Sequence, residues 1–245
     1  MTAKTRLDQA LVARGLCETR AKAQAAIAYG GVRVDGRPAT KPSQSVSAEA
    51  AITVTPPHPW VGRGGVKLAA ALDHFGIDPS GRTCLDVGAS TGGFTDVLLA
   101  HGARRVYAVD VGRDQLHPRL RADPRVRVME GVDARTLSPG AVDEQPSLLV
   151  ADLSFVSLTK VLDAPLALLS RGADVVVLVK PQFELDRRAL DKRGVVKTPT
   201  DRIRALDHVT QWLTYRVALH RAGPMQSPIA GGDGNVEFLV AGRAR

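Results

Sequence analysis

The stretch TCLDVGASTGGFT, residues 83–95, decides the fold of most of the chain. Its apolar start, residues 83–87, predicts a buried strand, and the glycines after it predict a tight turn into a helix. Glycine lets a ligand approach the backbone closely, and the first turn of a helix presents unpaired N–H groups. The spacing Gly88-x-x-x-Gly92-Gly93 differs from the Gly-x-Gly-x-x-Gly of dinucleotide-binding proteins, and no Gly-Lys-Ser/Thr follows as in a P-loop. The turn therefore predicts a ligand site of another kind at the end of the strand.

Strand and helix signals alternate through the rest of the chain. Helical stretches are predicted over Leu158–Ser170 and Asp201–His220. Short apolar runs predict further strands, at Val106–Val109, Val126–Val128, Leu148–Ala151 and Val175–Val179, with a late strand at Asn235–Val240. This alternation is typical of an α/β fold, in which helices cover both faces of a parallel sheet.

Three carboxylates follow strands of this predicted sheet. Asp86 ends the first strand, where it could meet a positively charged ligand group, and Asp110 ends the second, where a carboxylate can accept two ribose hydroxyls. Asp133 follows the third strand and could meet an adenine amino group. Together with the glycine turn, these acids suit S-adenosylmethionine. The predicted cofactor contacts are Asp86, Gly88, Ala89, Ser90, Thr91, Gly92, Gly93, Phe94, Thr95, Asp110, Val111 and Asp133.

The first 58 residues form a separate pattern. A helix is predicted from Leu7, and a second from an N-cap at Thr19 to Tyr29, where Gly30-Gly31 ends it. Short strands are predicted at Val32–Val34, before an Asp35-Gly36 turn, and at Ile52–Val54. The run Pro56-Pro57-His58-Pro59 interrupts regular structure. We therefore expect a small α+β domain over 1–58, a linker over 59–66 and the α/β domain over 67–245.

Composition and charge narrow the function. The 245 residues carry a net charge of +8, and the first 58 hold eight basic and four acidic residues, so this quarter supplies half of the excess. A basic balance favours polyanionic partners. No apolar run approaches the ~18–20 residues of a membrane span, so no stable membrane insertion is expected. With only two cysteines, a disulfide framework and a Cys-rich zinc site are disfavoured, and a cytoplasmic location fits best.

Four stretches of the chain, taken in order, resemble the TlyA family. They are residues 83–112 (TCLDVGASTGGFTDVLLAHGARRVYAVDVG), Ala151–Leu158 (ADLSFVSL), Val179–Glu184 (VKPQFE) and Ser227–Leu239 (SPIAGGDGNVEFL). Members of that family are rRNA 2'-O-methyltransferases that act on cytidine and often carry the name haemolysin. Residues 6–54 resemble the alpha-L RNA-binding domain, the type named after ribosomal protein S four.

The resemblance implies a Rossmann-like class I methyltransferase domain of the FtsJ (RrmJ) type, which uses a Lys-Asp-Lys-Glu tetrad. The matching positions are Lys67, Asp152, Lys180 and Glu237. Lys180 would activate the 2'-hydroxyl, Asp152 would position Lys180, and the other two would orient the ribose and the lysine pair. No metal is required by this chemistry.

The resemblance also implies a partner, rRNA within the small or the large ribosomal subunit, or both. Phosphate contacts are expected from basic residues of the first domain, namely Arg6, Arg20, Lys22, Arg33 and Lys41. The sequence leaves three alternatives: a non-catalytic RNA-binding factor of ribosome assembly, a haemolysin-like membrane-active protein, and a dehydrogenase of related fold, which the glycine spacing disfavours.

Overall fold

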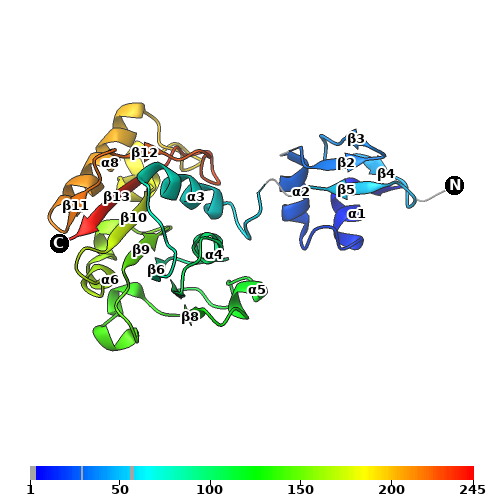
Figure 1. Ribbon diagram of the computed structural model, residues 1–245. Coiled ribbons are helices and arrows are strands. Elements are labelled where there is room, and N and C mark those ends of the chain that lie inside the picture. Colours follow the sequence, from blue (N-terminus) through cyan, green and yellow to red (C-terminus); the bar gives the residue numbers. More distant parts are fainter. Residues whose placement is uncertain (1–3, 29, 56–57) are drawn as a thin grey trace. The chain divides into compact units, whose positions relative to one another are not determined.

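The computed structural model describes residues 4–28, 30–55 and 58–245, and the chain divides into two compact units, Met1–Pro59 and Trp60–Arg245 (Figure 1). The predicted helix end at Tyr29 and the prolines Pro56 and Pro57 lie outside the described residues. Each unit encloses its own apolar core.

The first unit packs two helices against short strands. Its elements are β1 (Thr5–Arg6), α1 (Leu7–Ala13), α2 (Arg20–Ala28), β2 (Val32–Val34), β3 (Arg37–Pro38), β4 (Ser45–Val46) and β5 (Ile52–Val54). The hydroxyl of Thr19 accepts a hydrogen bond from the Lys22 N–H at 3.2 Å, which fits its predicted role as N-cap. Gly30, with φ +75°, ends the helix as predicted.

Three strands of the first unit form a small antiparallel sheet of order β3-β2-β5, and β1 and β4 form a separate antiparallel pair. Asp35 and Gly36 form the turn between β2 and β3 with φ values of +50° and +76°, the left-handed conformation that a two-residue hairpin requires. The predicted strands at 32–34 and 52–54 are confirmed as direct neighbours.

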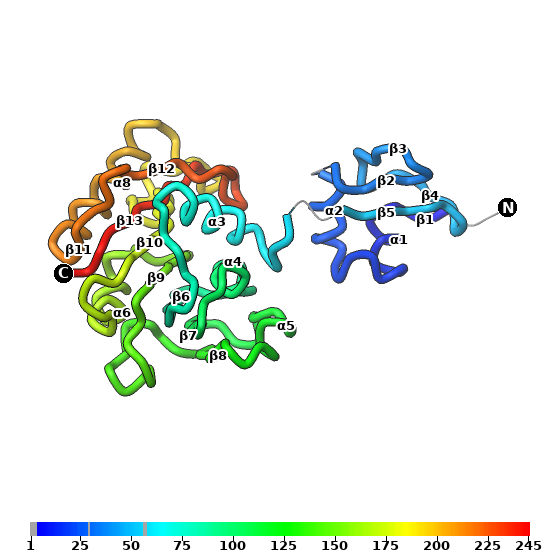
Figure 2. The backbone as a smooth tube through the Cα atoms, viewed as in Figure 1, coloured from blue at the N-terminus to red at the C-terminus, as the bar shows by residue number. Residues whose placement is uncertain are grey.

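The second unit is built on one large sheet, whose strand order is β11-β13-β10-β9-β6-β7-β8 (Figure 2). The pairs β10·β9, β9·β6, β6·β7 and β7·β8 are parallel, whereas β13 is antiparallel to β10 and β11. The strands are β6 (Thr83–Val87), β7 (Arg105–Asp110), β8 (Val126–Glu130), β9 (Leu148–Ala151), β10 (Asp174–Val179), β11 (Val217–Leu219), β12 (Met225–Gln226) and β13 (Phe238–Ala244). The predicted α/β class is confirmed.

Helices cover both faces of this sheet (Figure 1). Cys84 of β6 packs in one core with α3 and α4, and its neighbour Leu85 packs in the other core with α8. This alternation follows from the two-residue period of a strand. The helices are α3 (Gly64–Phe75), α4 (Gly93–Ala100), α5 (Pro118–Arg121), α6 (Asp163–Ala167), α7 (Pro181–Glu184) and α8 (Pro199–Thr214). Within the described residues, no helix is both long and apolar enough to cross a lipid bilayer.

Two helix predictions are wrong in part. The predicted helix 158–170 is only a 3-10 turn, Leu158–Lys160, followed by α6, because Pro165 lacks an N–H and fits only the first turn of a helix. The predicted helix 201–220 ends at Thr214, and β11 follows because it pairs with β13. The late strand begins at Phe238 rather than at residue 235.

Residues 60–66, predicted as linker, pack against the second unit. The Val61 N–H donates to the Asp96 carboxylate at 2.9 Å, and the Trp60 ring lies 6.3 Å from that of His101, measured between centroids. A Cβ on Gly65 would lie 2.4 Å from Trp60, so only glycine fits beneath the indole. The helix α3, which carries Lys67, already starts at Gly64.

Candidate active site

The glycine loop after β6 bends sharply at the carboxyl edge of the sheet. Gly88 has φ +86°, and a Cβ there would lie 2.5 Å from the backbone oxygen of Asp152. Gly92 has φ +96°, and a Cβ there would overlap the side chain of Leu120. Both positions therefore require glycine, for conformation and for space. The loop then enters α4 at Gly93, as predicted.

A cavity of about 510 Å³ opens between this loop and the ends of β7, β8 and β9. Asp110 stands at its rim, where its two carboxylate oxygens accept backbone N–H bonds from Ser90 at 2.8 Å and Gly112 at 2.7 Å. These donors fix the carboxylate and leave it further lone pairs for a ligand. Much of the lining is apolar, from Val111, Val132, Ala134, Leu153, Val156 and Val161 among others. The cavity thus combines an apolar slot with one fixed carboxylate.

Asp133 also lines this cavity, but its carboxylate pairs with Arg135 at 2.5 Å. The Arg135 guanidinium lowers the pKa of Asp133 to about 2, with the Arg135 backbone N–H adding to the effect. The predicted adenine contact is therefore an ion-paired carboxylate, with Arg135 as a second polar group of the lining.

The loop that carries Val111 to Leu116 is held by Glu130, the last residue of β8. Its carboxylate accepts the N–H groups of Asp114, Gln115 and Leu116 at 3.0, 2.8 and 2.8 Å and pairs with Arg121 at 2.5 Å. Burial acts to raise the pKa of Glu130, but these donors outweigh it and lower the pKa to about 2. Glu130 is thus a permanent anion that shapes one wall of the cavity.

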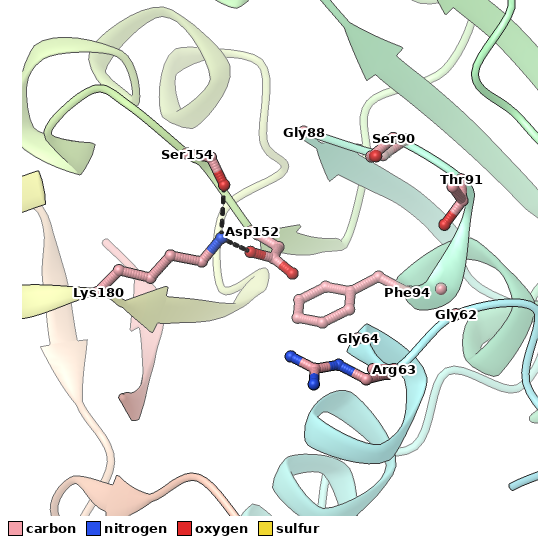
Figure 3. A pocket seen from close by; sticks show the side chains of 12 residues that line it. Gly62, Arg63, Gly64, Gly88, Ser90, Thr91, Phe94, Asp152, Ser154 and Lys180 are labelled. Atoms are coloured by element: carbon pink, nitrogen blue, oxygen red, sulfur yellow. Dashed lines mark hydrogen bonds and ion pairs between the residues drawn. The ribbon is translucent and has the colours of Figure 1, made fainter. Parts of the chain in front are cut away.

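A second, smaller cavity of about 200 Å³ adjoins the first and shares Gly88, Ser90, Asp152 and Ser154 with it. Figure 3 shows Phe94 and the Arg63 guanidinium on the side facing Asp152. Gly62, before α3, and Gly64, its first residue, let the backbone approach the loop, since a Cβ on Gly62 would lie 2.9 Å from the Thr91 hydroxyl.

Lys180 and Asp152 meet in this smaller cavity (Figure 3). The Lys180 Nζ lies 2.6 Å from Asp152 Oδ1 and donates to the Ser154 hydroxyl at 2.8 Å. Asp152 follows β9, and Lys180 follows the adjacent parallel strand β10, so both emerge at one edge of the sheet. Their side chains stay 20% and 11% exposed, which leaves the pair open to a ligand.

Lys67 and Glu237 form a second ion pair, 2.5 Å from Nζ to Oε2, and this pair is buried. Glu237 directly precedes Phe238, which pairs with Val179, so it lies beside Lys180 just beyond the β10·β13 ladder. A Cβ on Gly231 would lie 2.5 Å from Glu237 Oε1, so glycine makes room for the carboxylate. The four predicted tetrad residues thus form two ion pairs.

Most predicted cofactor contacts line one of the two cavities, namely Gly88, Ala89, Ser90, Thr91, Gly93, Phe94, Asp110, Val111 and Asp133. Asp86, Gly92 and Thr95 are not among the lining residues. Asp86 is completely buried and accepts the Thr95 hydroxyl at 2.6 Å. Burial raises its pKa to about 7 against the lowering effect of Thr95. Asp86 thus bonds to the first turn of α4, and its role as a cofactor contact stays a prediction.

Several lining residues carry no signal in the sequence. Ser154 follows Asp152 by two positions, and Phe155 is 91% exposed with φ +66° at the rim of the larger cavity. An exposed aromatic residue with positive φ in the loop after β9 is a structural signal that no sequence pattern gives. Arg63 is the N-cap of α3. Its only signal in the sequence is its position four residues before Lys67, a predicted site residue.

The basic residues predicted to contact RNA lie on the first unit in different settings. Arg6 and Arg20 both bond to the buried carboxylate of Asp8. Lys22 pairs with Glu18 at 2.5 Å. Arg33 donates to a backbone oxygen at 3.1 Å, and Lys41 is exposed.

Comparisons with known proteins agree with this architecture. Residues 60–244 match the FtsJ-like methyltransferase family, and residues 5–52 match the S4 domain. The 16S/23S rRNA (cytidine-2'-O)-methyltransferase TlyA of Mycobacterium tuberculosis is 47% identical over 242 residues, covering 98% of this chain and 90% of the relative. Hemolysin A of Brachyspira hyodysenteriae is 38% identical over 236 residues, covering 96% of this chain and 98% of the relative.

A solved structure from Streptococcus thermophilus, of a protein that carries the name hemolysin, has a TM-score of 0.77 to this chain. Its sequence is 38% identical, and the match covers 100% of this chain and 90% of that one. Fold, cavity position and full-length similarity coincide. The chain therefore belongs to the FtsJ-like methyltransferases and, within them, to the TlyA family.

Proposed function

We propose that this protein transfers a methyl group from S-adenosylmethionine to the ribose 2'-hydroxyl of a cytidine in rRNA. The observation that carries the proposal is the Lys180–Asp152 pair, which lies in a cavity that the glycine loop also lines. A donor bound at the loop and a ribose beside the lysine would meet at this edge of the sheet.

The described residues fit the cofactor. The larger cavity has the size of a small-molecule site, about 510 Å³, and offers an apolar slot for a purine ring and the fixed carboxylate of Asp110 for a ribose diol. The turn at Gly88 and Ser90 would lie against the amino-acid end of the nucleoside. When bound, the cofactor supplies an electrophilic methyl group on a sulfonium.

Lys180 is the residue that we propose to activate the hydroxyl. An amine nitrogen has four tetrahedral positions, of which one joins the side chain and two face Asp152 and Ser154. The remaining position is free to face a ribose oxygen. In its amine form Lys180 offers its lone pair at this position. As the ribose oxygen forms its bond to the methyl carbon and the carbon–sulfur bond breaks, the hydroxyl proton passes to that lone pair. Asp152 stabilises the resulting ammonium.

Lys67 and Glu237 would act mainly by positioning. Their ion pair is buried, and neither residue is among those that line the two cavities. Glu237 sits beside the strand end that carries Lys180, so the pair would fix that end and thereby the lysine that faces the ribose. Correct alignment of hydroxyl and methyl supplies a large part of the acceleration in such transfers.

The proposed substrate is rRNA in the small subunit, the large subunit or both. The Mycobacterium tuberculosis relative is named for 16S and 23S rRNA, and the S4 match falls on the basic first unit. Such a substrate implies that the protein works in the cytoplasm on ribosomal subunits. Nucleotide choice would depend on rRNA shape and on a nucleotide that leaves its stack.

Methyl transfer to ribosomal subunits tests the proposal. The purified protein should transfer tritiated methyl from S-adenosylmethionine to subunits from a strain that lacks its gene, and primer extension should map one or a few modified cytidines. Lys180→Ala should abolish transfer while thermal unfolding and S-adenosylhomocysteine binding stay close to wild type. Full activity of that variant would refute the role of Lys180, and absence of any transfer by the wild type would refute the function.

A further inference from the structure

We propose that Asp8 is a positioning residue that holds Arg6 and Arg20 as a preorganised arginine pair for RNA phosphates. The inference rests on the proposed function, because it concerns how the first unit grips an RNA substrate. It assigns a role in RNA binding to an acidic residue, although a carboxylate by itself repels phosphate.

The geometry centres on one carboxylate. Asp8 has no accessible surface, although it lies in the first turn of α1. Arg6 reaches it through two nitrogens, with Nε 3.1 Å from Oδ1 and Nη2 3.1 Å from Oδ2, and Arg20 Nε donates to Oδ2 at 2.8 Å. The Gln24 amide and the Gln9 backbone N–H complete the shell at 2.9 and 3.1 Å.

Two arginines on one carboxylate leave a net charge of +1 at the surface. Their side chains stay 42% and 53% exposed. Within the part of the chain that the structure describes, Arg20 makes hydrogen bonds through Nε alone, so both of its terminal nitrogens remain available. The same holds for Arg6 Nη1. The pair therefore presents free N–H donors outward while its inner edges are anchored.

Anchoring matters because an arginine side chain loses rotamer freedom when it binds. The conformational entropy that an arginine side chain loses is among the largest of any side chain. A guanidinium that is already fixed in the free protein loses less conformational entropy on binding. A phosphate oxygen pair also matches the fork of an anchored guanidinium. By contrast, Arg14 of the same unit bonds to its own fold, because it donates to the backbone oxygens of Ser47, Ala48 and Ala50.

A substitution that removes the acid separates preorganisation from plain electrostatics. Asp8→Asn raises the net charge of the unit by one, so charge alone predicts tighter RNA binding. Preorganisation predicts weaker binding, because an amide cannot hold two guanidinium groups. Glu49→Gln is the matched control: it removes the same charge from an exposed side chain of the same unit.

The experiment measures binding and turnover with full-length protein and subunits from the gene-deleted strain. We expect Asp8→Asn to raise the Kd for subunits, and the KM, about tenfold, with kcat at saturating subunits and the Kd for S-adenosylhomocysteine unchanged. Glu49→Gln should bind as tightly as wild type or more tightly. Asp8→Asn binding equal to or tighter than wild type would overturn the inference.

A thermodynamic cycle excludes a merely structural effect. In an Arg6→Ala/Arg20→Ala background, Asp8→Asn should have no further effect on the Kd, since nothing remains to be positioned. An equal tenfold loss in that background would also overturn the inference.

Arg20→Lys keeps the proposal testable if Asp8→Asn does not fold, because Arg20 lies on the surface. Arg20→Lys should weaken binding of subunits nearly as much as Arg20→Ala does. Wild-type affinity of Arg20→Lys would contradict the proposed role of the arginine pair. Wild-type protein that transfers no methyl group would refute the proposed function, a result separate from all of these.

Discussion

Lys67 and Glu237, which are 170 positions apart in the chain, form a buried ion pair with 2.5 Å between Nζ and Oε2. The pair joins α3 to the residue that precedes β13, and so ties the start of the second unit to its late strand. Both side chains are shielded from solvent, with 7% and 2% of their surface exposed. We therefore expect the pair to be a structural requirement of the proposed site.

Removing one member of this pair should destabilise the second unit. We expect Lys67→Met or Glu237→Gln to lower the free energy of unfolding by about 3–5 kcal/mol, because the remaining charge is buried without a partner. The double variant Lys67→Met/Glu237→Leu should recover part of this loss. Urea unfolding of the three variants gives the measurement, and additive losses in the double variant would contradict the pairing.

The Lys180–Asp152 pair should affect chemistry far more than binding. Asp152→Asn keeps the shape of the side chain but removes the charge that stabilises the Lys180 ammonium. We expect kcat to fall by about 10²–10⁴, with the Kd for S-adenosylhomocysteine within a few fold of wild type. Single-turnover methyl transfer and calorimetry separate the two quantities. An unchanged kcat would remove Asp152 from the mechanism.

Glu130 should control cofactor affinity through the loop 111–116. Glu130→Ala leaves three backbone N–H groups without their acceptor, so the wall formed by Val111, Gly112 and Gln115 should loosen. We expect the Kd for S-adenosylhomocysteine to rise about tenfold, equivalent to ~1.4 kcal/mol, while subunit affinity is unchanged. Glu130→Gln, which keeps one acceptor oxygen, should have a Kd between those of the wild type and Glu130→Ala. Equal affinity in all three proteins would show that the loop needs no such support.

Asp86 should give the stability of the protein a particular dependence on pH. Burial raises its pKa to about 7 in the folded state, against about 3.9 when unfolded. Between these values only the folded state keeps the proton, so stability falls as pH rises from about 4 to about 7 and then levels off, by at most about 4 kcal/mol for this group.

Asp86→Asn should remove that slope. The free energy of unfolding of wild type and variant, measured by urea at pH 4.5, 6 and 8, should diverge toward high pH in favour of the variant. Comparing slopes cancels any constant penalty of the amide. Parallel curves would show that Asp86 titrates normally.

The sheet could be predicted because its strands are buried on both faces. Continuous apolar runs such as Leu148–Ala151 and Val175–Val179 are distinctive, and the glycine loop has a spacing that local sterics impose. The strand β11 could not be found this way. It is three residues long, and its conformation depends on pairing with β13, a contact that local sequence does not contain.

The sequence indicates which residues lie at the edge of the sheet better than it indicates how their side chains are oriented. Strand ends place Asp152, Lys180 and Asp110 at one edge by topology alone. The burial of Asp86 and the capture of Asp133 by Arg135 depend on where neighbouring side chains point. Likewise, the sequence around Asp8 does not indicate that its carboxylate bonds to two arginines.

The interior position of β13 has a consequence for biosynthesis. Among the described strands of its sheet, β13 is made last, yet it lies between β10 and β11 and follows directly upon Glu237. A nascent chain therefore exposes the bare edge of β10, a site prone to mispairing, until residues 238–244 have left the ribosomal tunnel. Premature termination just before Phe238 would leave β10 permanently uncovered, so a short C-terminal deletion should lead to aggregation rather than to a partly active enzyme.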